Sequence, residues 1–322
     1  MKIVFMGTPD LAAEVLNTMM EKGCEVTLAV TQPDRPKGRG RGVIKTPVHK
    51  CADRWGIPVF APDKVKRPEA VERLRRESPD LIVVAAFGQI LSKEILDLPP
   101  YGCVNVHASL LPKYRGAAPI QWAVINGEEK SGVTIMQMDE GLDTGDILLQ
   151  EEIPLEPGET GESLYKKMAA LGGELLVKAL PMIEAGSLVP IKQDGAASTY
   201  ASMLKKEMGN IDWTMSAVQI ERLVRGLNSW PGAFTYLGGK MLKIWGAAVA
   251  DAAAQGLCGA GGEAGRIAGT IAGTDKDAVY VTCGEGVLAL TEVQYEGKKR
   301  MSTRNFLLGA RVEPGQKLTR ER

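Results

Sequence analysis

Cysteine and histidine are scarce in this sequence, which limits the kinds of site that it can hold. The cysteines, at positions 24, 51, 103, 258 and 283, lie far apart and form no CxxC pair. We therefore expect buried thiols, and neither a disulfide framework nor a zinc site. The chain has only two histidines, His49 and His107, so histidine-based chemistry has two candidate positions.

Long apolar runs and an excess of one charge are also missing. No run reaches the roughly 18 apolar residues of a membrane span, and residues 1–6 enter a strand pattern without the charged leader of a signal peptide. The 39 basic residues balance the 39 acidic ones, which excludes a wholesale polycation. We expect a globular, soluble, cytoplasmic monomer whose 322 residues suffice for two domains.

The glycines of a dinucleotide-binding loop are absent as well. Gly7-Thr8-Pro9-Asp10 follows the first expected strand but lacks the second and third glycines of GxGxxG, so the sequence excludes NAD. Strand and helix patterns nevertheless alternate over residues 1–188, which predicts a Rossmann-like, doubly wound α/β domain. The expected strands include 2–6, 25–30, 81–86 and 133–138, and the expected helices are 11–21, 47–55, 68–76, 120–126 and 162–185.

Residues 189–206 are polar and are predicted to form a linker, after which residues 207–322 change character. A helix capped by Asp212-Trp213-Thr214 is expected to run to Arg225. Short alternating runs between glycines then predict a small, OB-like β-barrel, with strands at 234–237, 241–245, 278–282 and 287–293. Residues 247–273 are rich in alanine and glycine and are expected to hold weakly specified strands and a loop.

Asn105 and His107 end one predicted strand and precede a loop stiffened by Pro112, Gly116 and Pro119. Alternate residues of a strand share a face, so both side chains should project together. Ligands of open α/β sheets bind beyond such strand ends. An asparagine amide can donate to a developing oxyanion, and histidine can exchange protons near neutral pH. A histidine that is only packed and hydrogen-bonded is the alternative.

An acidic loop follows the strand at 133–138, with the sequence Asp139-Glu140-Gly141-Leu142-Asp143-Thr144-Gly145-Asp146. One of its carboxylates could orient the histidine and stabilise its cation, although composition does not select which one. A solvated turn or a cation site are the alternatives.

Two other regions are basic. In the loop 31–42, cations at positions 35, 37, 39 and 41 oppose only Asp34, so the loop either stays in solvent or binds phosphates. A modest basic excess after position 291 is typical of a solvated surface, but it also suits the rim of a nucleic-acid-binding barrel. Together they favour a large polyanionic partner that is held at two places.

The segments NVHASLLPKYRGAAPIQWAVINGE and SGVTIMQMDEGLDTGDIL, with MGTPD and TQPDRPKGRG near the start, resemble the folate-dependent formyltransferases almost end to end. The resemblance is greatest to the branch that formylates methionyl initiator tRNA. It implies that Asn105, His107 and Asp143 are catalytic and that 10-formyltetrahydrofolate is the formyl donor. No metal is needed for this chemistry.

The resemblance also implies binding residues. Folate would be held by two segments: Ser109, Leu110, Leu111 and Pro112, and Phe87, Gly88, Gln89 and Ile90. The loop after position 31 would reach the tRNA acceptor stem. The expected tRNA-binding residues are Arg39, Arg41, Lys205, Lys206, Lys298 and Arg304.

Other functions remain open at this stage. A glycinamide ribonucleotide or sugar-nucleotide formyltransferase, or a formyltetrahydrofolate hydrolase, would share the NxH motif and the aspartate. The basic loop and the C-terminal barrel argue against these. A non-enzymatic RNA-binding module would leave the NxH, SLLP and LDTGD motifs unexplained.

Overall fold

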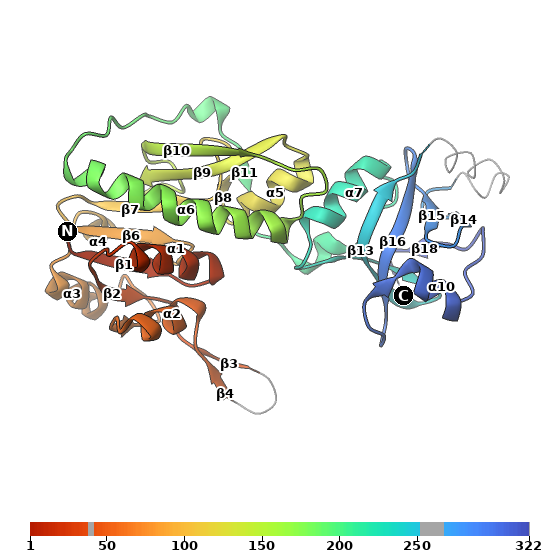
Figure 1. The fold of residues 1–322 in the computed structure, drawn as a ribbon, viewed down its shortest axis with the longest axis horizontal. Helices are drawn as coiled ribbons and strands as arrows, with labels where there is room; N and C mark the ends of the chain where they lie inside the picture. The colour runs from red at the N-terminus through yellow and green to blue at the C-terminus, as the bar shows by residue number, and fades with distance from the viewer. Residues whose placement is uncertain (38–41, 252–266, 322) are drawn as a thin grey trace. The chain divides into compact units, whose positions relative to one another are not determined.

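The computed structural model describes residues 1–37, 42–251 and 267–321. The chain divides into two compact units (Figure 1). Unit 1 comprises Met1–Ile120, Lys130–Leu155 and Leu164–Ser202, and unit 2 comprises Gln121–Glu129, Glu156–Ser163 and Met203–Arg322.

Unit 1 is built on a seven-stranded sheet with the order β10-β9-β7-β6-β1-β2-β5. Parallel pairing runs through β5, β2, β1, β6 and β7 in that order. Strand β9 pairs antiparallel with β7, and β10 pairs antiparallel with β9. The strands are β1 (Ile3–Gly7), β2 (Val26–Val30), β5 (Val59–Phe60), β6 (Leu81–Ala85), β7 (Cys103–His107), β9 (Lys130–Gln137) and β10 (Ile147–Pro154). The strand order reverses between β1 and β6, and such a switch point is where open α/β sheets bind ligands.

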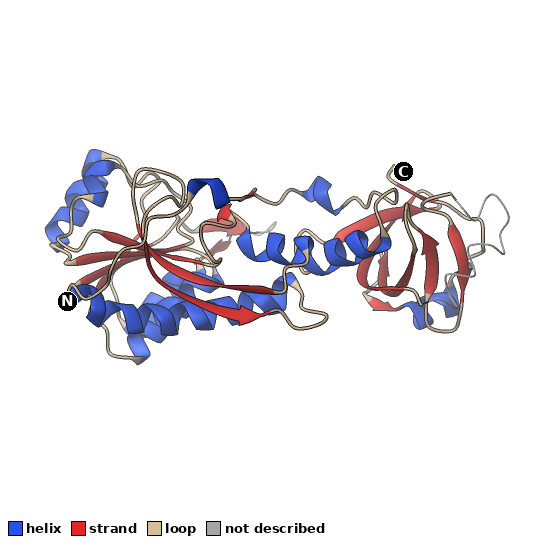
Figure 2. Cartoon of the chain, turned by 90° about the horizontal axis from the view of Figure 1, so that it is seen from above, coloured by secondary structure: helices blue, strands red, loops and turns tan. Residues whose placement is uncertain are grey.

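Helices cover both faces of this sheet (Figure 2), which confirms the predicted Rossmann-like architecture. On one face α3 and α4 contribute Leu74 and Ile95 to a core that also holds Val4 and Ile82 of the sheet. On the other face, a Cβ on Gly172 of α6 would lie 2.9 Å from Val106 Cγ1 of β7, so a glycine is needed for this close approach. The helices are α1 (Asp10–Glu21), α2 (Pro47–Trp55), α3 (Pro68–Glu77), α4 (Lys93–Leu96), α5 (Pro119–Asn126) and α6 (Gly161–Glu184).

Two short pairs of strands complete unit 1. The predicted basic loop forms an antiparallel hairpin of β3 (Arg35–Lys37) and β4 (Gly42–Ile44). The second pair is parallel and joins β8 (Arg115–Gly116) to β11 (Tyr200–Ala201). The segment predicted as a linker therefore supplies a strand to unit 1, and it also holds the short helix η1 (Gly195–Ala197).

Unit 2 contains an antiparallel sheet with the order β14-β15-β16-β13-β12-β18, and β17 pairs with β16. Its edges meet, because Ile271 N–H donates to Gln316 O and Leu318 N–H donates to Gly269 O, both at 2.8 Å. The result is the small barrel that the alternating runs predicted. Its elements are η2 (Lys206–Gly209), α7 (Ala217–Gly226), β12 (Ala233–Leu237), β13 (Lys240–Val249), β14 (Ile271–Thr274), β15 (Val279–Thr282), β16 (Val287–Tyr295), β17 (Met301–Ser302), α10 (Thr303–Gly309) and β18 (Leu318–Thr319).

The predicted start of the first helix of unit 2 was wrong. The carboxylate of Asp212 accepts hydrogen bonds from Thr214 N–H at 3.0 Å and Thr214 Oγ1 at 2.7 Å, which closes a turn before the helix. Helix α7 instead begins after Ser216, which forms a capping box with Gln219. Within the alanine- and glycine-rich segment, β13 extends to Val249 and β14 begins at Ile271, while residues 252–266 lie outside the described residues.

Candidate active site

Asn105 and His107 lie at the carboxyl-terminal end of strand β7, on the side of the sheet where its parallel neighbour β6 also ends. Asn105 is half-buried, and only 6% of His107 is exposed. Both residues pair with β9, Asn105 opposite Met136 and His107 opposite Thr134. Two polar side chains therefore stand at the end of an otherwise apolar strand, as their alternation in the sequence predicted.

The hydrogen bonds of His107 determine which ring nitrogen is available. Its Nε2 lies 2.9 Å from the carbonyl oxygen of Tyr114. A carbonyl only accepts hydrogen bonds, so Nε2 carries a hydrogen and donates it. The other nitrogen, Nδ1, lies 3.8 Å from Asp143 Oδ2. Nδ1 is therefore the imidazole nitrogen that faces Asp143, while Nε2 is bonded to the main chain.

Asp143 lies in the loop between β9 and β10. Its carboxylate accepts from the backbone N–H of Gly116 at 2.8 Å and from Asn105 Nδ2 at 3.5 Å. Its backbone has φ +53°, in the left-handed region that non-glycine residues rarely adopt. Of the aspartates in the predicted acidic loop, Asp143 is therefore the one that the fold brings to Asn105 and His107.

The segment from Ser109 to Pro112 is held in place by hydrogen bonds with side chains of β9 and β10. Thr134 Oγ1 donates to Ser109 O at 2.6 Å and accepts from Leu111 N–H at 3.2 Å, while Gln150 Nε2 donates to Leu111 O at 2.8 Å. Leu111 is buried and Leu110 is half-buried. These bonds give the loop after His107 a defined shape.

The segment from Phe87 to Ile90 follows β6, next to the switch point of the sheet. Thr8, just after β1, donates its hydroxyl to Phe87 O at 3.0 Å. Phe87 is buried in the core, and Gln89 bonds Val65 N–H at 2.7 Å and Pro62 O at 3.1 Å. Ile90, by contrast, is 84% exposed. Phe87 and Gln89 thus hold the segment, and Ile90 exposes its apolar side chain.

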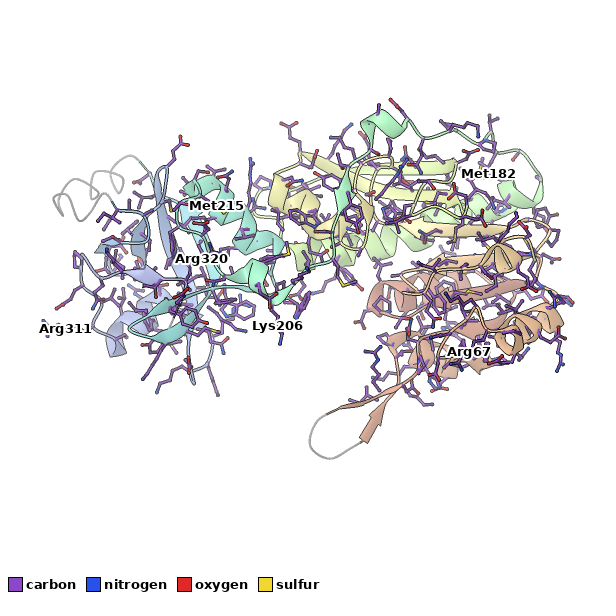
Figure 3. The ribbon with its side chains drawn as sticks, turned by 180° about the vertical axis from the view of Figure 1, so that it is seen from behind. Arg67, Met182, Lys206, Met215, Arg311 and Arg320 are labelled. Carbon is purple, nitrogen blue, oxygen red and sulfur yellow. The ribbon has the colours of Figure 1, made fainter. Side chains whose placement is uncertain are left out.

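The basic residues that were predicted to bind tRNA differ in their surroundings. Arg39 and Arg41 lie outside the described residues. Lys205, Lys206 and Lys298 are exposed in unit 2, and Lys206, labelled in Figure 3, is the first residue of the short helix η2. Arg304 is also exposed, but its Nε lies 3.4 Å from Asp277 Oδ1, which partly neutralises its charge.

Several groups at these sites were not predicted from the sequence. The carbonyl of Tyr114 and the N–H of Gly116 belong to the main chain and leave no sequence signal. Gln193 bonds the carbonyl of Asp143 from within the predicted linker, 50 residues further along the chain. In unit 2, Arg300 Cζ stands 4.7 Å from the ring centroid of Trp245, and Lys243 Nζ, on the same strand β13 as Trp245, lies 5.7 Å from it.

A metal site and a cysteine nucleophile are poorly supported by the described residues. Within the described part of the chain, His, Cys, Asp and Glu form no group of three that could hold a metal ion. Cys103 shares β7 with Asn105, but burial raises the pKa of its thiol to about 12, so it stays protonated and is a poor nucleophile. None of the described helices is long and apolar enough to cross a membrane.

The structural neighbours show a shared fold. A sugar 3N-formyl transferase, WlaRD, aligns with a TM-score of 0.64 and 18% identity over 93% of this chain and 99% of that one. HypX from Aquifex aeolicus, in complex with tetrahydrofolic acid, aligns with a TM-score of 0.62 and 19% identity over 96% of this chain and 47% of its own.

Sequence relatives are much more similar. The methionyl-tRNA formyltransferase of Agathobacter rectalis is 52% identical over 99% of this chain and 100% of that protein. The protein of the same name from Geobacter sulfurreducens is 48% identical over 99% of this chain and 96% of its own length. Residues 1–180 match the formyl transferase family, and residues 203–311 match the formyl transferase C-terminal domain. The chain therefore belongs to the formyl transferase family.

Proposed function

We propose that this protein transfers the formyl group of 10-formyltetrahydrofolate to the α-amino group of methionine on initiator tRNA. The observation that carries this proposal is the convergence of Asn105, His107 and Asp143 at the carboxyl end of β7. The full-length relatives named methionyl-tRNA formyltransferase support the choice of acceptor. An enzyme with this acceptor acts where translation takes place, which makes the cytoplasm its proposed location.

The three residues suit acyl transfer to an amine. The amine attacks the formyl carbon, and the carbonyl oxygen becomes an oxyanion that Asn105 Nδ2 and His107 Nδ1–H can stabilise. His107 Nε2 is engaged by Tyr114 O, so Nδ1 is the nitrogen that faces the reaction. The Asp143 carboxylate lies on the side of that nitrogen and can hold the imidazole in one orientation. Collapse of the intermediate forms the amide and breaks the bond to folate N10, which takes up a proton.

The attacking amine must also lose a proton. His107 cannot serve as the neutral base while its cation stabilises the oxyanion. Asp143, or a water that it holds, is the group within reach that can accept this proton. Its carboxylate is held in place by hydrogen bonds from Gly116 N–H and Asn105 Nδ2, beside His107.

We assign folate to the two segments that follow β6 and β7. Residues 87–90 lie beside the switch point, and residues 109–112 belong to the loop that follows His107. The solved HypX structure with tetrahydrofolic acid has the same fold. The bound folate would supply the formyl group, and these segments would orient it toward His107.

We assign the tRNA to the residues between β3 and β4 in the sequence and to unit 2. Arg39 and Arg41 are the candidate contacts in the first of these, and Lys205, Lys206 and Lys298 are the exposed candidates in unit 2. A small methionyl amine offers little binding energy of its own, so remote contacts must position it for reaction.

An acceptor panel tests this function. The protein is supplied with 10-formyltetrahydrofolate and one of five acceptors, and release of tetrahydrofolate is followed. The acceptors are methionyl initiator tRNA, methionyl elongator tRNA, free methionine, glycinamide ribonucleotide and an amino-sugar nucleotide. Only the initiator should react efficiently. Faster formylation of the ribonucleotide or the sugar nucleotide would refute the tRNA assignment and leave formyl transfer in place.

A further inference from the structure

The segment of residues 191–201, which we call the strap, is bonded to both loops that border the candidate active site. Ile191 exchanges two backbone hydrogen bonds with Ile147, at 2.8 and 2.9 Å, next to the acidic loop. At its other end the strap pairs through β11 with β8, which follows the loop after His107. All these residues belong to unit 1, so the strap is an integral part of it.

Gln193 is the side chain of the strap that reaches the acidic loop. Its Nε2 donates to the carbonyl oxygens of Asp143 at 2.9 Å and Gly145 at 2.7 Å. Its Oε1 accepts from Nε of Arg115 at 3.0 Å and from Nη2 at 2.7 Å. Carbonyls only accept and a guanidinium only donates, so the orientation of this amide is unambiguous. Both amide hydrogens and the amide oxygen are engaged.

The bond to Asp143 matters because this residue has an unfavourable backbone. A non-glycine residue at φ +53° persists only where its surroundings hold it. Gln193 fixes the carbonyls on either side of Thr144, and Gly116 N–H fixes the carboxylate itself. Together these bonds determine where the carboxylate points.

The same strap also supports the partner of His107. Thr199 Oγ1 accepts from Tyr114 N–H at 2.8 Å, and Tyr114 O is the acceptor for His107 Nε2. Thr199 O accepts from Arg115 N–H at 2.9 Å. The aspartate and the histidine are thus held against each other by one continuous piece of chain.

We propose that Gln193, oriented by Arg115, is a positioning residue that sets the Asp143 carboxylate against His107. It does not reach the reacting atoms and acts only through Asp143. The inference rests on the proposed catalytic role of Asp143, and its tests separate it from the choice of acceptor.

A double-mutant cycle tests the proposal in the full-length protein. Gln193→Ala should lower kcat about 10- to 100-fold, the range expected when a catalytic group is misplaced by about 1 Å, with little change in the KM for folate. In an Asp143→Ala background the same substitution should change kcat by less than about twofold, because the group that it positions is gone. An equal loss in both backgrounds would overturn the proposal.

Two further variants sharpen the cycle. Lys192→Ala is the matched control, since Lys192 is the neighbouring strap residue, its side chain is 90% exposed, and it pairs with Asp146 only at 3.7 Å. It should keep kcat within about twofold of wild type, as expected for a surface ion pair. Gln193→Glu keeps the acceptor for Arg115 but sets a carboxylate against two carbonyls, so it should lose as much activity as Gln193→Ala. Wild-type turnover by this variant would contradict the assignment.

Hydrogen exchange provides a readout that needs no substrate. Peptides covering residues 139–147 should exchange faster in Gln193→Ala than in wild type, and they should be unchanged in Lys192→Ala. Unaltered exchange in Gln193→Ala would refute the positioning role. If the wild-type protein prefers another acceptor, the cycle is measured with that acceptor, so failure of the proposed function leaves this test intact.

Discussion

His49 and His107 each lie beside an aspartate in unit 1, His49 on helix α2 and His107 at the end of strand β7. His49 Nδ1 is 2.8 Å from Asp34 Oδ2, whereas His107 Nδ1 is 3.8 Å from Asp143 Oδ2. The closer pair lies at the base of the β3–β4 hairpin, where Asp34 also accepts from Thr46 N–H at 3.0 Å, next to the start of α2. It joins the hairpin to the helix.

The more distant pair has the surroundings of a catalytic site. Asn105 Nδ2 and Gly116 N–H both donate to the carboxylate of Asp143, and Tyr114 O selects which nitrogen of His107 faces it. The shorter histidine–aspartate distance is therefore not the feature on which we propose the catalytic pair. The convergence of additional polar groups at a strand end is the more informative feature.

Removing each imidazole should give the largest difference between the two regions. His107→Ala should lower kcat by about 10² to 10⁴, the range for losing an acid–base group or an oxyanion donor. His49→Ala should leave kcat within about threefold, because its pair stabilises structure near the surface. Single-turnover formyl transfer, with circular dichroism to confirm folding, measures both. Near-normal turnover by His107→Ala would show that the assigned site is wrong.

Removing only the charge of each aspartate should give a smaller but sharper contrast. Asp143→Asn keeps the shape of the side chain and loses the negative charge beside His107, so kcat should fall by about 10². Asp34→Asn should keep its turnover and lose about 1 kcal/mol in the free energy of unfolding, measured in urea. Equal kinetic losses in both variants would mean that the two pairs share one function.

The smallest effect is expected for a substitution between β3 and β4, close in sequence to the His49–Asp34 pair. Arg39→Ala should weaken the use of tRNA and leave folate binding unchanged. If Arg39 contacts one phosphate, the slope of log affinity against log salt should decrease by about 0.7 to 0.9. Arg304→Ala is the comparison. Arg304 already pairs with Asp277, so its substitution should change the slope less. Identical slopes for wild type and Arg39→Ala would contradict a phosphate contact.

Local sequence patterns predicted much of the fold because their causes are local. Helix α2 begins and ends where predicted, at Pro47 and Trp55, since Thr46 caps its first turn and Gly56 adopts the left-handed conformation that ends it. The error at Asp212 has a similar origin. Aspartate and serine are both good caps, and only the pairing of Ser216 with Gln219 decides between them.

The sequence by itself determined the alternation of strands and helices, the placement of Asn105 and His107 on one side of β7, and the presence of an acidic loop. These follow from side-chain periodicity and turn residues, which act over a few positions. Residue patterns alone did not select the aspartate that faces the histidine, and only the family resemblance named Asp143. The tertiary structure decided which imidazole nitrogen is available and that Gln193 supports the pair. Those contacts join residues 27 to 50 positions apart, or use main-chain groups that every residue possesses, so no local pattern encodes them.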